Sequence, residues 1–196
     1  MIHATILGGF GGQGLLFAGQ ALAQAGVDAG LIVSWMPSYG PEMRGGTASC
    51  TVIVADHRIG SPIVDVADSV IALNPPALAK FESILAPGGL LIVNSSLIEA
   101  TPSRADIEVL AIPCTDLARA AGDDRLVSVV ALGGLLARRP IVSPEALGAA
   151  LRELVGRHHP ELVAADLMAF SSGLEAGSGA GAGTVATPAA AAEIIS

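Results

Sequence analysis

Short apolar runs separated by glycine-rich or amphipathic segments dominate the first part of the chain. Six of these runs are rich in β-branched and aliphatic residues, which predicts strands. They cover residues 2–8, 31–35, 47–55, 69–73, 90–93 and 107–112. Helical periodicity follows the first run at 13–25, and a second helix is predicted over 75–85, where two prolines mark its start. The first three elements are therefore expected to form a βαβ unit.

The second part of the chain has the pattern of a helical segment. Residues 116–121, 126–137 and 144–155 each show apolar positions at helical spacing. The last segment, 173–196, is rich in Ala and Gly and has little to bury, which favours a flexible extension. We therefore expect an α/β domain over 1–172, with a Rossmann-like open, mostly parallel sheet flanked by helices and a helical C-terminal part, followed by a flexible tail.

Composition and charge exclude several classes of function. Aromatic residues make up 3% of the 196 residues and the formal net charge is -8, so a nucleic-acid partner, which needs clustered cations, is not expected. The two cysteines, Cys50 and Cys114, lie too far apart in sequence for this chain alone to build a zinc site or an iron–sulfur cluster. The start of the chain lacks the pattern of a leader peptide and no apolar run reaches membrane-spanning length, so we expect a cytoplasmic protein.

Five glycines stand in the stretch LGGFGGQG, residues 7–14. The stretch satisfies the pattern GxGxxG between a predicted strand and a predicted helix, where helix N–H groups can bind a phosphate. A dinucleotide site also needs an acidic residue at the end of the second strand, and the sequence has Ser34, Trp35 and Met36 there, which argues against NAD. The alternative is a tight turn that lets the helix pack closely on the sheet. The two interpretations are compatible.

A second motif, SYGPEMRGG, follows the second predicted strand over residues 38–46. Loops after strands of an open α/β sheet are where ligands bind. Arg44 offers a planar fork for a carboxylate or phosphate, and Gly45 and Gly46 let a ligand or a neighbouring chain approach the backbone. The alternative is an ordinary surface arginine in a turn, paired with Glu42.

These motifs together resemble the gamma subunit of 2-oxoacid:ferredoxin oxidoreductases. The resemblance runs from Ile2 to about Phe170 and is most specific in the GGQG turn and in the SYGPExRGG loop. It continues through PPALAKFESILAPGGLLIVNSS and IPCTDLARAAGDDRLVSVVALGGLLA. An Asn that is usual in the family before the last of these helices is replaced here by the sequence 126–128, Leu-Val-Ser.

The resemblance implies oxidative decarboxylation of a 2-oxoacid with coenzyme A, which gives an acyl-CoA, carbon dioxide and reduced ferredoxin or a similar reduced acceptor. It implies alpha and beta subunits, with a delta subunit in some complexes, as the partners. Thiamine diphosphate, Mg²⁺ and the iron–sulfur clusters belong to these partner subunits. No catalytic residue and no metal ligand is expected in this chain, so the isolated chain is expected to be inactive. The resemblance leaves the identity of the 2-oxoacid open.

The residues expected to bind a cofactor are those of the two glycine-containing motifs, which would hold a phosphate of coenzyme A through backbone amides and one cation. They are Gly9, Gly11, Gly12, Gln13, Gly14, Ser38, Tyr39, Arg44, Gly45 and Gly46. The alternatives are a non-catalytic adaptor whose two loops only contact the alpha chain, and a free-standing Rossmann-type nucleotide-dependent dehydrogenase.

Overall fold

A six-stranded sheet forms the centre of the protein in the computed structural model, which describes residues 1–39 and 47–179. The strands are β1 (Ile2–Phe10), β2 (Ile32–Tyr39), β3 (Thr47–Ala55), β4 (Ala67–Ala72), β5 (Leu85–Asn94) and β6 (Glu108–Ile112). Their order in the sheet is β2-β3-β1-β4-β5-β6. The pairs β1–β4, β4–β5 and β5–β6 are parallel, whereas β3 runs antiparallel to both of its neighbours. The expected open and mostly parallel α/β sheet is confirmed.

The expected βαβ unit is wrong in one respect, because β1 and β2 are not neighbours. β3 lies between them, and its Thr51 is opposite Ile6 of β1 on one side and Met36 of β2 on the other. The reason is the short connection, residues 40–46, that joins β2 to β3. A short connection allows antiparallel pairing of consecutive strands, whereas parallel pairing needs a long crossover.

Two strands are longer than their apolar patterns predict. The second strand is predicted to end at Trp35, before Pro37, but β2 continues to Tyr39. β2 is an edge strand, and an edge position tolerates the missing N–H of proline. The second predicted helix, 75–85, is also too long: the helix ends at Phe81, and residues 86–89, APGG, belong to β5.

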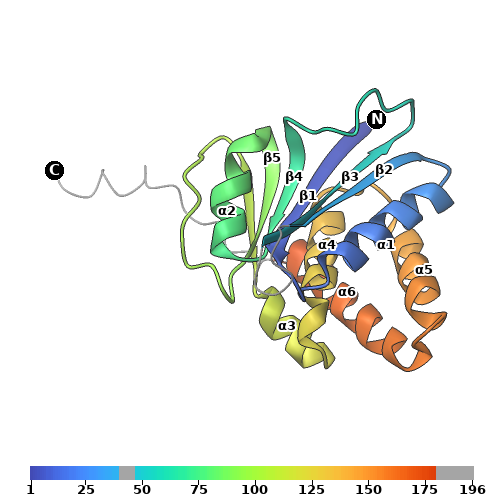
Figure 1. Cartoon of the computed structure of the whole chain (residues 1–196). Coiled ribbons are helices and arrows are strands. Elements are labelled where there is room, and N and C mark those ends of the chain that lie inside the picture. Colours follow the sequence, from blue (N-terminus) through green and yellow to red (C-terminus); the bar gives the residue numbers. More distant parts are fainter. Residues whose placement is uncertain (40–46, 180–196) are drawn as a thin grey trace.

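Helices cover the two faces of the sheet unequally. They are α1 (Leu15–Asp28), α2 (Pro75–Phe81), α3 (Cys114–Ala121), α4 (Val127–Arg138), α5 (Pro144–Gly156) and α6 (Val163–Ser178). Among the described helices, α2 alone lies on one face, and the others lie on the opposite face (Figure 1). The alternation along β1 follows this division, because Leu7 belongs to the large core under α1 and α4 and Ile6 to the smaller core under α2. No helix in the described ranges is long and apolar enough to cross a membrane.

The centre of the helical layer is the contact between α4 and α6, whose backbones approach closely at glycines. A Cβ on Gly173 would overlap the carbonyl oxygen of Val130, and one on Gly133 would lie 2.6 Å from the backbone nitrogen of Leu174. α6 continues to Ser178, so the first residues of the segment 173–196 are helical and packed. Residues 180–196 of the expected tail lie outside the described residues.

Candidate functional site

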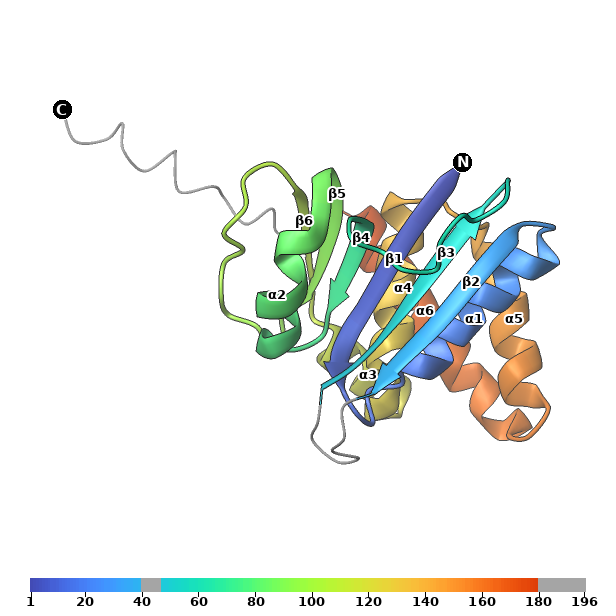
Figure 2. The same cartoon turned by 45° about the horizontal axis from the view of Figure 1, so that its top comes forward.

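The carboxyl ends of β1 and β4 lie side by side but lead to opposite faces of the sheet. After β1 the chain enters α1 on the face of the large core, and after β4 it enters α2 on the other face (Figures 1 and 2). The N–H of Leu73 donates to the carbonyl of Gly8 at 2.9 Å and joins the two ends. Adjacent parallel strands that diverge in this way form a topological switch point, where open α/β sheets bind their ligands.

The glycine turn, residues 9–14, lies at this switch point between β1 and α1. The side chain of Gln13 closes it, since its Oε1 accepts from the N–H of Phe10 at 2.7 Å. The backbone N–H of Gln13 donates to the carbonyl of Phe10 at 3.3 Å. The first turn of α1 has neither an acidic residue nor a side-chain cap, so its N–H groups and the positive end of its dipole are not compensated locally.

Two glycines of the turn have left-handed backbones but different surroundings. Gly14, with a φ of 73°, lies against the segment before α4, where a Cβ would overlap the carbonyl oxygen of Arg125. The buried Ser128 of α4 donates its Oγ–H to the carbonyl of Gln13. Gly12, with a φ of 100°, has no described atom within 4 Å of the position of a Cβ. Close packing therefore explains Gly14, whereas no contact among the described residues explains Gly12.

The strand register places the second motif at the same end of the sheet as the glycine turn, where β1 and β4 have their carboxyl ends. Ser38 lies opposite Ser49, and Phe10 lies opposite Thr47, so the chain enters and leaves the loop beside the glycine turn. Ser38 and Tyr39 belong to β2 itself. Arg44, Gly45 and Gly46 lie outside the described residues, as does Glu42, the alternative partner of the arginine.

A buried polar cluster that the sequence analysis did not identify fixes the neighbouring strand ends. Asn94 donates from Nδ2 to the carbonyl of Leu73 at 3.2 Å and to Oγ1 of Thr115 at 2.9 Å. Asn74 caps α2, since its Oδ1 accepts from the N–H of Ala77 at 2.9 Å. The Nδ2 of Asn74 is buried and has no partner among the described residues. An Asn between an apolar run and Pro-Pro is the sequence signal for this cap.

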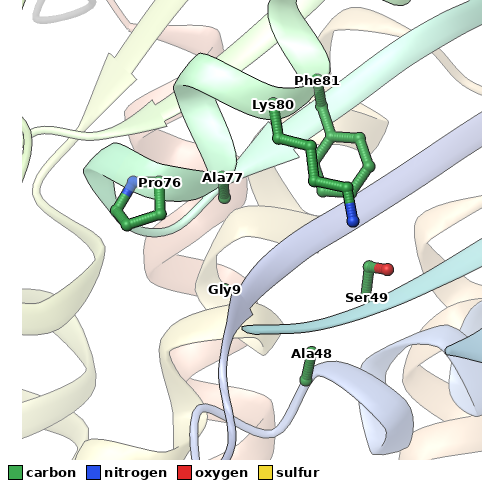
Figure 3. Close-up of a pocket in the computed structure, with 7 residues that line it drawn as sticks. All are labelled: Gly9, Ala48, Ser49, Pro76, Ala77, Lys80 and Phe81. Atoms are coloured by element: carbon green, nitrogen blue, oxygen red, sulfur yellow. The ribbon is translucent and has the colours of Figure 1, made fainter. Parts of the chain in front are cut away.

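A small hollow opens beside the glycine turn, on the face that carries α2 (Figure 3). Gly9, Ala48, Ser49, Pro76, Ala77, Lys80 and Phe81 line it. The Nζ of Lys80 lies 4.9 Å from the centre of the Phe81 ring, and its side chain extends along the ring on the side that faces Ser49. The sequence analysis identified neither Lys80 nor Phe81 as part of a site, although Lys80 is the only lysine of the chain. The hollow places one cation and one hydroxyl beside the turn.

Burial shifts the pKa values of Asp166 and of the two cysteines. Burial and the charge of Asp123 raise the pKa of Asp166 to about 6, against the opposing effect of Arg125. Burial raises the pKa of the Cys50 thiol to about 12 and also raises that of Cys114, so both thiols are protonated at neutral pH. Within residues 1–39 and 47–179, no three His, Cys, Asp or Glu side chains form a metal-binding group.

Comparison with known proteins places these features in a family. The sequence model for "Pyruvate ferredoxin/flavodoxin oxidoreductase" matches residues 4–176. Ketoisovalerate oxidoreductase subunit VorA of Methanothermobacter thermautotrophicus is 42% identical over 131 residues, which are 67% of this chain and 27% of that protein. The chain thus spans less than a third of the length of this relative.

Two solved structures have the same fold over nearly the whole chain. The gamma subunit of a keto/oxoacid ferredoxin oxidoreductase from Geobacter sulfurreducens has 30% identity and a TM-score of 0.80, and the match covers 90% of this chain and 97% of that one. The 2-oxoglutarate:ferredoxin oxidoreductase from Magnetococcus marinus, solved with 2-oxoglutarate, coenzyme A and succinyl-CoA, has 25% identity and a TM-score of 0.81. In that case the match covers 90% of this chain and 31% of the other.

Proposed function

Because the chain belongs to the pyruvate ferredoxin/flavodoxin oxidoreductase family, we propose that it is the gamma subunit of a cytoplasmic, thiamine diphosphate-dependent 2-oxoacid:ferredoxin oxidoreductase. The complex would convert a 2-oxoacid and coenzyme A into an acyl-CoA and carbon dioxide, and would pass the electrons to ferredoxin or a similar acceptor. Alpha and beta subunits, with or without a delta subunit, would hold thiamine diphosphate, Mg²⁺ and the iron–sulfur clusters. The role of this chain is to bind coenzyme A and to contact those subunits.

The observation that carries the coenzyme A proposal is the glycine turn at the switch point between β1 and β4. The uncompensated N-terminus of α1 favours an anion, and Gly12 leaves space beside the backbone for one. Asn74 has a buried amide donor without a described partner at the same edge, which fits a polar ligand there. Bound coenzyme A supplies the thiol that accepts the acyl group. The residues of this chain would hold its phosphates, with Arg44 as the added cation.

The sheet face that carries α2 supports contact with a partner subunit. α2 lies over the β4 side of this face, and β1, β3 and β2 are in view beside it (Figure 2). None of the alternate positions of β1, β3 and β2 on this face is a charged residue. Ile2, Ile32 and Met36 on it are 52%, 46% and 39% exposed. An uncharged face with exposed apolar side chains is typical of the centre of a protein interface.

The test of the proposed function uses the complex reconstituted from this chain and its partner subunits. Gly12→Val should raise the KM for coenzyme A or abolish activity, because the branched side chain fills the space beside the turn. Gly30→Val is the matched control. Gly30 also has a left-handed backbone, with a φ of 76° and no described atom within 4 Å of a Cβ. It precedes β2, however, and so lies at the opposite end of the strands from the glycine turn.

Arg44→Ala is expected to raise the KM for coenzyme A with little change in kcat, because it removes a cation and no backbone contact. Equal effects of Gly12→Val and Gly30→Val, with an unchanged KM in Arg44→Ala, would mean that the two motifs do not bind the coenzyme. Turnover of a 2-oxoacid by the isolated chain with coenzyme A and a redox dye would contradict the subunit assignment itself.

A further inference from the structure

We propose that Lys80, with the hydroxyl of Ser49, forms a second anion subsite that holds a phosphate group of coenzyme A apart from the glycine turn. The inference rests on the proposed function and extends it to residues that neither motif contains. Gly9 links the two places, because it belongs to the glycine turn and also lines the hollow in front of Lys80. A ligand with more than one phosphate can therefore occupy both.

The position of Lys80 depends on the close approach of α2 to β1. A Cβ on Gly8 would lie 2.6 Å from Cε2 of Phe81 and 3.0 Å from the Cβ of Ala77, so the absence of a side chain at Gly8 lets α2 lie on the strand. Phe81 then lies under the ammonium group of Lys80 at 4.9 Å. Such a cation–π contact favours one position of a flexible side chain. The ammonium group is thus held beside the hollow (Figure 3).

Two other described cations at this end of the sheet are paired with carboxylates, whereas Lys80 remains available to an anion. Arg119 and Arg125, which also belong to segments after the carboxyl ends of strands, pair with Asp124 at 3.1 Å and with Asp123 at 2.6 Å. None of the ion pairs in the described residues includes Lys80. The lining of the hollow contains no acidic residue. In a chain with a formal net charge of -8, a cation without an ion-pair partner among the described residues, beside a hollow whose lining has no acid, is a preferred place for a phosphate.

The lining also fits the rest of such a ligand. Pro76, Ala77 and Phe81 supply an apolar wall, and Ser49 supplies a hydroxyl that can donate to a phosphate oxygen. The hollow therefore offers an anion one cation and one hydroxyl beside an apolar wall.

The first experiment measures coenzyme A binding by calorimetry to the complex purified through this chain. Lys80→Ala should weaken binding by about 3- to 10-fold, as expected for the loss of one exposed ionic contact, and Lys80→Arg should restore most of the affinity. Ser49→Ala should have a smaller effect in the same direction. Arg58→Ala is the control, because Arg58 is an exposed cation in the connection between β3 and β4, at the opposite edge of the sheet. It should bind coenzyme A as the wild type does.

The second experiment uses the fact that the chain has a single lysine. Acetylation of the Lys80 amine by an N-hydroxysuccinimide ester is followed by mass spectrometry of the peptide that contains it. Saturating coenzyme A should slow this acetylation at least 3-fold, whereas pantetheine, which has no phosphate, should not. Dephospho-coenzyme A distinguishes the phosphates: protection by it assigns the diphosphate to Lys80, and its failure to protect assigns the 3′-phosphate. Both results support the subsite.

The subsite is contradicted if Lys80→Ala binds coenzyme A with wild-type affinity and the coenzyme does not slow acetylation. If Gly12→Val weakens binding in the same series, the proposed function stands without the subsite. If Lys80→Ala weakens binding and Gly12→Val does not, the Lys80 subsite is supported and the proposed role of the glycine turn is contradicted. A wild-type complex that does not bind coenzyme A contradicts both proposals.

Discussion

Replacement of Gly173 by alanine tests the packing of the helical layer on which the glycine turn rests. The added Cβ would overlap the carbonyl oxygen of Val130 and lie 2.8 Å from its carbonyl carbon and 3.1 Å from the Cα of Gly133. These are backbone atoms of α4, which cannot rotate away, so α4 and α6 must separate. Overpacking of this kind costs about 1–3 kcal/mol or more, and alanine returns at most about 1 kcal/mol through helix propensity.

We therefore expect Gly173→Ala to lower the free energy of unfolding by about 2 kcal/mol, which lowers the Tm of a domain of this size by about 4–8 °C. Urea unfolding followed by circular dichroism measures the change. Gly148→Ala in α5 is the matched control, because the nearest described atom to its Cβ is the flexible Nη1 of Arg152 at 3.7 Å. It should be neutral or stabilising by up to about 1 kcal/mol. If both variants unfold at the same urea concentration, the close contact between α4 and α6 is wrong.

Three further predictions concern side chains near the turn. Asp166→Asn should stabilise the protein by about 1–2 kcal/mol above pH 6. Burial and Asp123 raise the folded pKa of Asp166 from 3.8 to about 6, so the folded state binds the proton more tightly. The wild type therefore regains this stability as the pH falls from 6 to below 4, and urea unfolding should show the full difference at pH 7.5 and a clearly smaller one at pH 4.5. Cys50 and Cys114 should resist iodoacetamide at pH 8 in the folded protein and react in urea, because burial raises the pKa of both thiols; modification of either without denaturant would contradict their burial. Ser128→Ala should raise the KM for coenzyme A without loss of complex assembly, because the Ser128 hydroxyl holds the carbonyl of Gln13 in the turn; an unchanged KM would limit that hydrogen bond to a structural role.

The elements that could be predicted from the sequence are those whose local pattern agrees with their surroundings. The run 47–55 has the bounds of β3, and it could be predicted because it is rich in β-branched residues and follows a segment rich in Pro and Gly. The order of the strands could not be predicted, since insertion of β3 beside β1 depends on pairing across the sheet. The last helix was missed: no helix is predicted over 163–172, and the small residues from 173 onward suggest a flexible segment, although Gly173 and Gly177 serve close contact with α4.

In the candidate site, too, features that follow from a local pattern could be predicted, and contacts between distant residues could not. The glycine turn and the entrance of the second loop could be placed at one edge of the sheet, because both follow strands. The contacts of Gly14 with Arg125 and of Ser128 with Gln13 join residues more than a hundred positions apart, and no local pattern indicates them. Lys80 was missed for a different reason. A single lysine in an amphipathic helix is typical of a solvent-exposed face, and only the approach of α2 to Gly8 and Gly9 places it beside the turn.

The distribution of acidic residues over the helix starts supports an anion at the glycine turn. α3, α5 and α6 have Asp116, Glu145 and Asp166 in their first turns, where a carboxylate compensates the positive end of the helix dipole. The first turns of α2 and α4 have no acid either: the side chain of Asn74 caps α2, and the first residues of α4 are buried, where a carboxylate would be desolvated. α1 starts next to Gly12, where no described atom lies within 4 Å of the position of a Cβ, so burial among the described residues does not explain why a chain with 18 acidic residues has none in this turn. A phosphate that supplies the missing negative charge does explain it, because a fixed carboxylate at that place would repel the ligand.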